Sequence, residues 1–244
     1  MSEDTKLQTS RDFAQTENTA EKRIPLAFEQ RGLWFIQNIA PDCGAYNLIF
    51  SIQIDGQHVS GASVTTFLHQ LASDFPVLRC AMPADQEGPC MQLYETIQPV
   101  VLEHDVSGLD ETALREHARA LSSAPFSLAQ APLWRVHLLR RDSDSCLLVL
   151  AVHHALLDFW SLGLLLQETA SRLGLASSGN LYPDGNGYLN YAKAQESMIA
   201  APEKQSSWIK YWHTQLNGVP PVHDLVTDFP RPAVQVYRGK SLPF

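Results

Sequence analysis

Two adjacent histidines follow an apolar run in the second half of the chain, and an aspartate stands four residues further on. The run covers residues 146–152 (CLLVLAV), continues directly into His153 and His154, and is followed by Asp158. Imidazole has an unperturbed pKa of about 6.5, so it can take or give a proton at neutral pH. A nearby carboxylate can fix a ring orientation or the shape of a loop. The spacing therefore indicates acid–base chemistry at a short loop between a strand and a helix.

The two histidines cannot both serve one cavity. Adjacent residues at the end of a β-strand point in opposite directions, so one imidazole can face a cavity while the other faces protein. An alternative interpretation is that both are core or loop histidines with satisfied hydrogen bonds. A metal site is a weaker interpretation, because neighbouring histidines rarely share one ion and no further ligand stands at helical spacing. No zinc site or disulfide framework is predicted from the four scattered cysteines, Cys43, Cys80, Cys90 and Cys146.

Hydrophobic periodicity and turn residues predict the elements that must position this loop. The pattern indicates an α/β fold of the α+β sandwich kind, with a mixed β-sheet flanked by helices. Strands are expected over residues 46–54, 77–82, 91–101, 133–139 and 146–152, and helices over residues 29–39, 60–73, 110–122, 160–173, 188–199 and 204–216. The run at 146–152 is apolar throughout, which is typical of a central strand covered on both faces.

The ends of the chain differ in composition from its middle. Residues 1–23 are polar and lack periodicity, so we expect a disordered tail or linker there, with order beginning near Ile24. Residues 177–187 are rich in turn-forming types, and residues 218–244 are proline-rich and expected to be extended. The folded part is therefore predicted to be a single unit over residues 24–244.

Charge and hydropathy restrict the class of protein. The 244 residues carry a net charge of −8, and the 18 lysines and arginines form no cluster, which argues against nucleic acid as a partner. No run of about 18 apolar residues predicts a membrane-spanning helix. The first residues contain no apolar segment of the kind found in signal peptides, so a cytoplasmic protein is expected.

Further motifs resemble those of a known family. Residues 153–158 match the pattern H-H-x-x-x-D-G except at its last position, and Phe159, Trp160 and Ser161 follow where that family has G-W-S. Other motifs occur in the family's order at residues 26–37, 45–47, 76–79, 125–128, 132–135, 188–192, 211–218, 227–232 and 238–239. Together they resemble the N-terminal lobe of condensation domains from nonribosomal peptide synthetases and hybrid polyketide synthases, within the chloramphenicol acetyltransferase-like superfamily.

The resemblance implies an amide-forming acyltransferase. Condensation domains join a carrier-bound acyl or peptidyl thioester to an amine, or in variants a hydroxyl, of an acceptor. Both substrates are held on phosphopantetheine arms, so the implied partners are acyl or peptidyl carrier proteins, with no metal and no directly bound cofactor. The barrier lies in holding two tethered reactants together and in managing proton and oxyanion charge.

The resemblance also implies roles for the loop residues. His154 faces the substrate tunnel as a general base or as a group that positions the acceptor amine, and His153 supports it from the scaffold side. Asp158 is structural and pairs with an arginine to hold the loop. The helix that follows begins beside the site, where its amide dipoles could stabilise an oxyanion. Candidates for the tunnel wall are Phe159, Trp160 and Ser161; Trp160 is expected to pack more than to carry substrate, and Ser161 could be a helix cap.

The sequence departs from the family pattern in three places. Phe159 replaces the glycine after the aspartate, Gly32 replaces an arginine, and Asn190 replaces an aspartate. These changes leave several alternatives open: a non-catalytic module that recruits carrier proteins, a variant for chain release or dehydration, or a free-standing acyltransferase that uses coenzyme A. Motifs of the C-terminal lobe are also absent, so we expect the chain alone to be nearly inactive.

Overall fold

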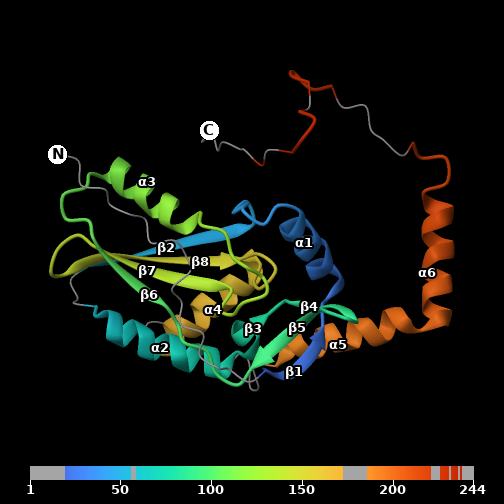
Figure 1. The fold of residues 1–244 in the computed structure, drawn as a ribbon, viewed down its shortest axis with the longest axis horizontal. Helices are drawn as coiled ribbons and strands as arrows, with labels where there is room; N and C mark the ends of the chain where they lie inside the picture. The colour runs from blue at the N-terminus through green and yellow to red at the C-terminus, as the bar shows by residue number, and fades with distance from the viewer. Residues whose placement is uncertain are drawn as a thin grey trace.

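A computed structural model describes residues 20–55, 59–172, 186–220, 226–230, 232–235 and 237. In these ranges the chain forms two small β-sheets and six α-helices (Figure 1). The helices are α1 (Phe28–Ile39), α2 (Gly61–Asp74), α3 (Glu111–Ser122), α4 (Phe159–Arg172), α5 (Gly187–Ala200) and α6 (Pro202–Gln215). The predicted α/β class with a mixed sheet flanked by helices is confirmed.

The larger sheet supports the histidine loop. Its strand order is β2 (Asn47–Asp55), β8 (Ser145–His153), β7 (Trp134–Arg140) and β6 (Val101–Asp105). The β6–β7 pair is parallel and the other two pairs are antiparallel, so the sheet is mixed. Strand β8 therefore lies between two neighbours and delivers His153 to the end of the sheet.

Both faces of this sheet are covered, as the apolar run in β8 predicted. Helix α3 lies on one face, and α2 and α4 lie on the other (Figure 1). On the α3 side, Leu114 and Ala118 pack with Leu139 and Val149 in a small buried cluster. The opposite side belongs to the main core, which continues to the second sheet. A strand between two apolar layers can be apolar at every position.

The smaller sheet extends the main core and carries the start of the ordered chain. Its order is β1 (Ala20–Pro25), β5 (Gly88–Tyr94) and β3 (Cys80–Ala81), with β4 (Ala84–Asp85) paired to β5. Strand β1 begins at Ala20, so the expected start of order near Ile24 is four residues late, because pairing with β5 orders the polar residues before it. The expected disordered tail otherwise lies outside the described residues.

Two expected strands differ from the structure. Over residues 77–82 the chain first forms a 3₁₀ turn (η1, Pro76–Arg79), because proline at a first helical position has the required φ, and only Cys80–Ala81 is extended. The expected strand at 91–101 is two strands in different sheets, β5 and β6, and Pro99 lies in the connection between them. The expected turn-rich segment at 177–187 and the extended tail after residue 218 fall mostly outside the described ranges.

The last helices leave the body of the molecule. Helix α5 packs on β1, whereas α6 projects away from both sheets and buries none of its residues (Figure 1). No helix within the described ranges is long and apolar enough to cross a membrane. The four cysteines are free thiols, and Cys146 is buried as expected.

Candidate active site

Both neighbours of β8 hold the start of the histidine loop. Asn47 of β2 lies opposite His153 in the sheet register. The His153 amide donates to the Leu133 carbonyl at 2.9 Å, and the His154 amide donates to the Tyr46 carbonyl at 2.8 Å. Backbone hydrogen bonds on both sides therefore hold the two histidines, independently of any contact that their side chains make. The expectation that only one of them points away from the protein follows from this strand geometry and is met.

His153 is the histidine that faces protein. Its side chain is fully buried, and the Phe126 ring contacts it edge-on. Nδ1 accepts a hydrogen bond from the Ala155 amide at 3.1 Å, which places the ring proton on Nε2, 3.2 Å from Oε1 of Gln37. Burial, and then the neighbouring His154, lower the pKa of His153 to about 4. His153 is therefore neutral at physiological pH and serves as a structural support.

Gln37 connects His153 to the end of helix α1. Its Nε2 donates to the carbonyls of Pro41 and Cys43 at 3.1 and 3.2 Å, while its Oε1 accepts from His153. A second buried glutamine, Gln30, donates to the Ala155 carbonyl at 2.8 Å. Helix α1 thus supports the loop with two side chains seven positions apart on one helical face. The sequence analysis did not identify either glutamine, although two amides on the apolar face of α1 are the signal that could have revealed them.

We expect Gln37→Leu to destabilise the fold by about 2 to 3 kcal/mol, because it leaves the His153 Nε2–H group and two loop carbonyls without their partner. Urea unfolding at pH 7 measures the effect. Asn38→Leu is the matched control, since Asn38 lies next to Gln37 on α1 but is exposed, and it should change stability by no more than about 0.5 kcal/mol. Equal effects of the two changes would contradict the supporting role of Gln37.

His154 is the more accessible of the two histidines. It is half-buried, in the turn directly after β8. Its Nδ1 lies 3.1 Å from the Leu157 carbonyl, an acceptor that selects the tautomer with the proton on Nδ1. The lone pair therefore lies on Nε2, and no hydrogen-bond partner of Nε2 is found among the described residues. A fixed ring with a free nitrogen is the arrangement that a general base requires.

Asp158 caps helix α4. Its Oδ1 accepts from the Ser161 amide at 2.7 Å, so the cap is Asp158 and the alternative role of Ser161 as the cap is wrong. None of the ion pairs between described residues involves Asp158, so its expected pairing with an arginine stays a prediction. Hydrogen bonds from Ser161 hold the pKa of this carboxyl below its usual value. The group is ionised and weakly basic, which agrees with a structural role.

We expect Asp158→Ala to lower stability by about 1 kcal/mol, whereas Asp158→Asn should stay close to the wild type, because asparagine caps helices as well as aspartate does. Urea unfolding, together with faster hydrogen exchange of the Ser161 amide in the alanine variant, checks this. An asparagine variant as unstable as the alanine variant would indicate that the charge of Asp158, and not its cap, holds the loop.

Two aromatic side chains directly after the loop are uncovered, and so is one face of α1. Phe159 and Trp160, at the start of α4, are each 77% exposed, and Phe28, Phe35 and Ile39 of α1 are also exposed. Trp160, which we expected to pack more than to carry substrate, is not covered by the described residues, because the first turn of α4 points outward. Phe159 contacts the ring of Phe50 on β2 at a centroid distance of 6.0 Å. The loop is thus followed by two exposed aromatic side chains at the start of α4.

Neither metal ligation nor a zinc centre is indicated around the histidines. No group of three histidine, cysteine, aspartate or glutamate side chains within the described residues could hold an ion. The arrangement offers one imidazole with a free nitrogen, a supporting imidazole behind it, and a capped helix.

The family follows from comparison with known proteins. Residues 20–244 match the family model for the condensation domain. Phosphinothricin tripeptide synthetase PhsC of Streptomyces viridochromogenes is 34% identical over 228 residues, which are 91% of this chain and 21% of that protein. Chondramide synthase cmdD of Chondromyces crocatus is 30% identical over 91% of this chain and 6% of its own length. The chain belongs to the condensation domain family.

Solved structures agree with this assignment. A four-domain nonribosomal peptide synthetase, in its holo form with AMP and glycine, superimposes with a TM-score of 0.80 at 31% identity, over 92% of this chain and 17% of its own. The first condensation domain of the calcium-dependent antibiotic synthetase gives a TM-score of 0.64 at 21% identity, over 82% of this chain and 48% of its own. The chain therefore spans a small part of its multidomain relatives and about half of that condensation domain.

Proposed function

We propose that this chain is the N-terminal lobe of a condensation-type acyltransferase and that His154 acts on the acceptor. The lobe joins a donor acyl or peptidyl thioester to an acceptor amine or hydroxyl, both brought on phosphopantetheine arms by carrier proteins. The observation that carries this proposal is the placement of the His154 ring: its Nδ1 lies 3.1 Å from the Leu157 carbonyl, and no described residue forms a hydrogen bond with its Nε2. We also expect the protein to work in the cytoplasm.

The chemistry needs only proton transfer and positioning. The acceptor nitrogen attacks the donor thioester carbon, a C–N bond forms, and the C–S bond breaks. The proton released by the nitrogen passes to Nε2 of His154 and then to the departing thiolate, so the imidazole ends neutral. Neutral, buried His153 favours this cycle, because a second positive charge behind His154 would oppose its protonation.

The exposed apolar surface supports the proposal that a second lobe completes the substrate tunnel. Phe159 and Trp160, which directly follow Asp158, are each 77% exposed, and the chain spans 48% of a condensation domain of known structure. Soluble proteins seldom leave large apolar patches uncovered. We infer that a C-terminal lobe covers this surface and that the chain alone cannot place two carrier arms against each other.

The test is product formation on loaded carrier proteins, followed by intact-protein mass spectrometry. The chain is assayed alone, and then joined to the C-terminal half from its natural protein. We expect acceptor-bound product only from the two-lobe form. Full activity of the isolated chain would overturn the two-lobe account, and a two-lobe form that binds loaded carriers without product would overturn the enzymatic one.

A second candidate function is carrier recruitment without chemistry. It is favoured by Phe159, a large side chain where the family has glycine, and by Gly32, which replaces the arginine. Phe159→Gly in the two-lobe form separates the candidates. Product that appears only after this change identifies a blocked lobe, whereas product already present before it identifies an active one. A chain-release or dehydrating variant would instead give a free or dehydrated product in the same mass spectra.

A further inference from the structure

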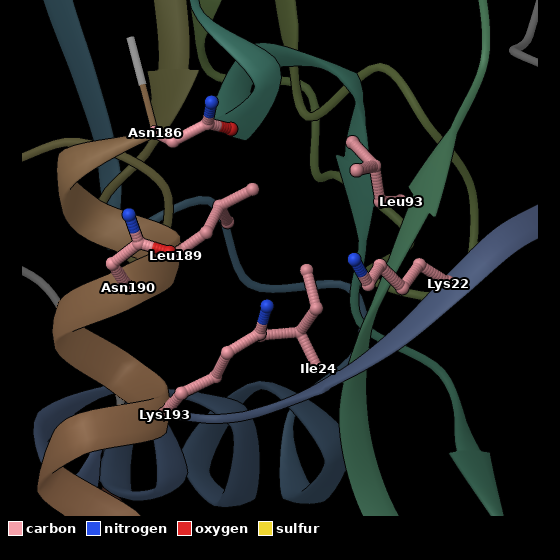
Figure 2. Close-up of a pocket in the computed structure, with 7 residues that line it drawn as sticks. All are labelled: Lys22, Ile24, Leu93, Asn186, Leu189, Asn190 and Lys193. Atoms are coloured by element: carbon pink, nitrogen blue, oxygen red, sulfur yellow. The ribbon is translucent and has the colours of Figure 1, made fainter. Parts of the chain in front are cut away.

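A small pocket lies between helix α5 and the smaller sheet, and its rim is polar. The cavity has a volume of about 230 Å³. Four side chains reach it from two walls: Lys22 from β1, and Asn186, Asn190 and Lys193 from α5 (Figure 2). Both lysine ammonium groups point toward the interior in Figure 2. None of these residues belongs to the histidine loop, so the pocket is separate from the candidate active site.

The convergence follows from the periodicity of the two elements. Positions 186, 189, 190 and 193 are spaced i, i+3, i+4 and i+7, so they share one face of α5. On β1, Lys22 and Ile24 alternate with Arg23 and lie on the same face of the sheet. Ile24, Leu93 and Leu189 are buried and form an apolar floor. The result is a concave site with charge at the rim and apolar surface below.

The electrostatics of the pocket favour an anion. Two ammonium groups and two carboxamides line it, and no carboxylate does. Neither Lys22 nor Lys193 forms an ion pair with any residue that the structure describes. The N-terminus of α5, with Asn186 as its cap residue, adds the positive end of a helix dipole.

Asn190 strengthens this interpretation. It occupies the position at which the family motif Y-x-D-Y-A has aspartate, and its side chain lines the pocket. A carboxylate there could neutralise one lysine and repel an anion, whereas a carboxamide of the same size can donate a hydrogen bond to one. The replacement therefore changes the charge of the pocket without changing its shape.

We propose that this pocket binds the phosphate group of a phosphorylated ligand. Lys22 and Lys193 supply the countercharge, Asn190 donates a hydrogen bond, and the floor accepts the short aliphatic part next to the phosphate. A volume of about 230 Å³ is below the range of roughly 300–1,000 Å³ typical of whole drug-sized ligands, so the pocket fits a headgroup. The inference does not depend on amide formation at His154.

The test is titration of the folded chain with inorganic phosphate at constant ionic strength, followed by amide shifts in two-dimensional NMR spectra. We expect saturable shifts in β1 and at the start of α5. Lys22→Met and Lys193→Met should each weaken binding by about tenfold or more, and the isosteric change Asn190→Asp should weaken it similarly, since each removes a charge-assisted contact or adds repulsion. Thermal unfolding establishes that each variant is folded.

A matched double variant distinguishes a specific phosphate site from nonspecific electrostatic attraction. Lys204→Met/Lys210→Met on the exposed helix α6 makes the same change in net charge as Lys22→Met/Lys193→Met, but away from the pocket. Binding that is lost in the pocket pair and kept in the α6 pair supports the proposal. Equal weakening in both pairs, or shifts that never saturate in the wild type, would overturn it.

The source of the phosphate can be read in the same spectra. Ethyl phosphate is a monoester dianion like a free phosphorylated metabolite, and diethyl phosphate is a diester monoanion like the link between a phosphopantetheine arm and its carrier. Saturable binding of the monoester alone assigns the pocket to a free phosphomonoester. Equal binding of the diester assigns it to a carrier-borne group. Both results support phosphate recognition, and binding of neither ester would contradict it.

Discussion

In a two-lobe protein that contains this chain, His154→Ala is expected to slow product formation by about 100- to 10,000-fold, the usual effect of removing a general acid–base group. The physical reason is that Leu157 fixes Nδ1 of the ring, while Nε2 has no hydrogen-bond partner in the part of the chain that the structure describes. Stability should change little, because the side chain is half-buried and makes one hydrogen bond. Quenched reactions analysed by intact-protein mass spectrometry measure the rate.

Two further variants define what His154 does. His69→Ala is the matched control, because His69 is an exposed histidine on α2, and its loss should leave the rate unchanged. His154→Gln keeps a side chain that can form hydrogen bonds but cannot accept a proton. A glutamine variant as slow as the alanine variant identifies a base, whereas substantial recovery identifies a positioning role. Full activity of His154→Ala would remove His154 from the mechanism.

The sequence predicted the part of the site that depends on local order. An apolar run that ends in two histidines, followed by an aspartate and an apolar helix, indicates a buried strand, a short loop and a helix start. Because side chains alternate between the two faces of a strand, His153 and His154 were then expected to point to different environments. The structure agrees on both points, and it adds that β2 and β7 hold the strand end from either side.

The parts that the sequence could not predict depend on contacts between distant segments. Gln37 meets His153 across 116 positions, and hydrophobic periodicity reports only that the face of α1 is buried, not which group it contacts. The run at 91–101 looks like one strand because periodicity does not reveal that its two ends join different sheets. The cap that Asp158 forms is revealed only by the position of the Ser161 amide, and its expected pairing with an arginine stays a prediction.

Acidification is expected to destabilise the fold strongly between pH 6.5 and pH 4, because two buried histidines are neutral in the folded state. His137 is 2% exposed, and burial, followed by His104 and Arg135, lowers its pKa to about 4; the pKa of His153 is lowered to about 4 by burial and by His154. In the unfolded chain both titrate near a pKa of about 6.5. The unfolded state therefore binds more protons below pH 6.5, so the stability present above that pH is lost progressively as the pH falls toward 4.

Each histidine is expected to lower the free energy of unfolding by about 3 kcal/mol at low pH. This value follows from the difference between its pKa of about 6.5 in the unfolded chain and about 4 in the folded one. Together the two losses are comparable to the total stability of about 5–15 kcal/mol that domains usually have. His137→Leu tests the contribution of one group. It removes a buried Nε2 that has no hydrogen-bond partner and leaves the half-buried His104 ring accessible to water. The variant should therefore lose about half of the acid dependence and little stability at pH 7.

Urea unfolding at pH 7, 6, 5 and 4.5 measures the slope of stability against pH for the wild type, for His137→Leu and for the exposed control His69→Leu. We expect a steep slope for the wild type and the control, and about half of it for His137→Leu. A slope unchanged by His137→Leu would mean that His137 is protonated in the folded state, with its ring charged next to His104. In that case the acid sensitivity would arise from His153, directly behind the residue on which the proposed chemistry depends.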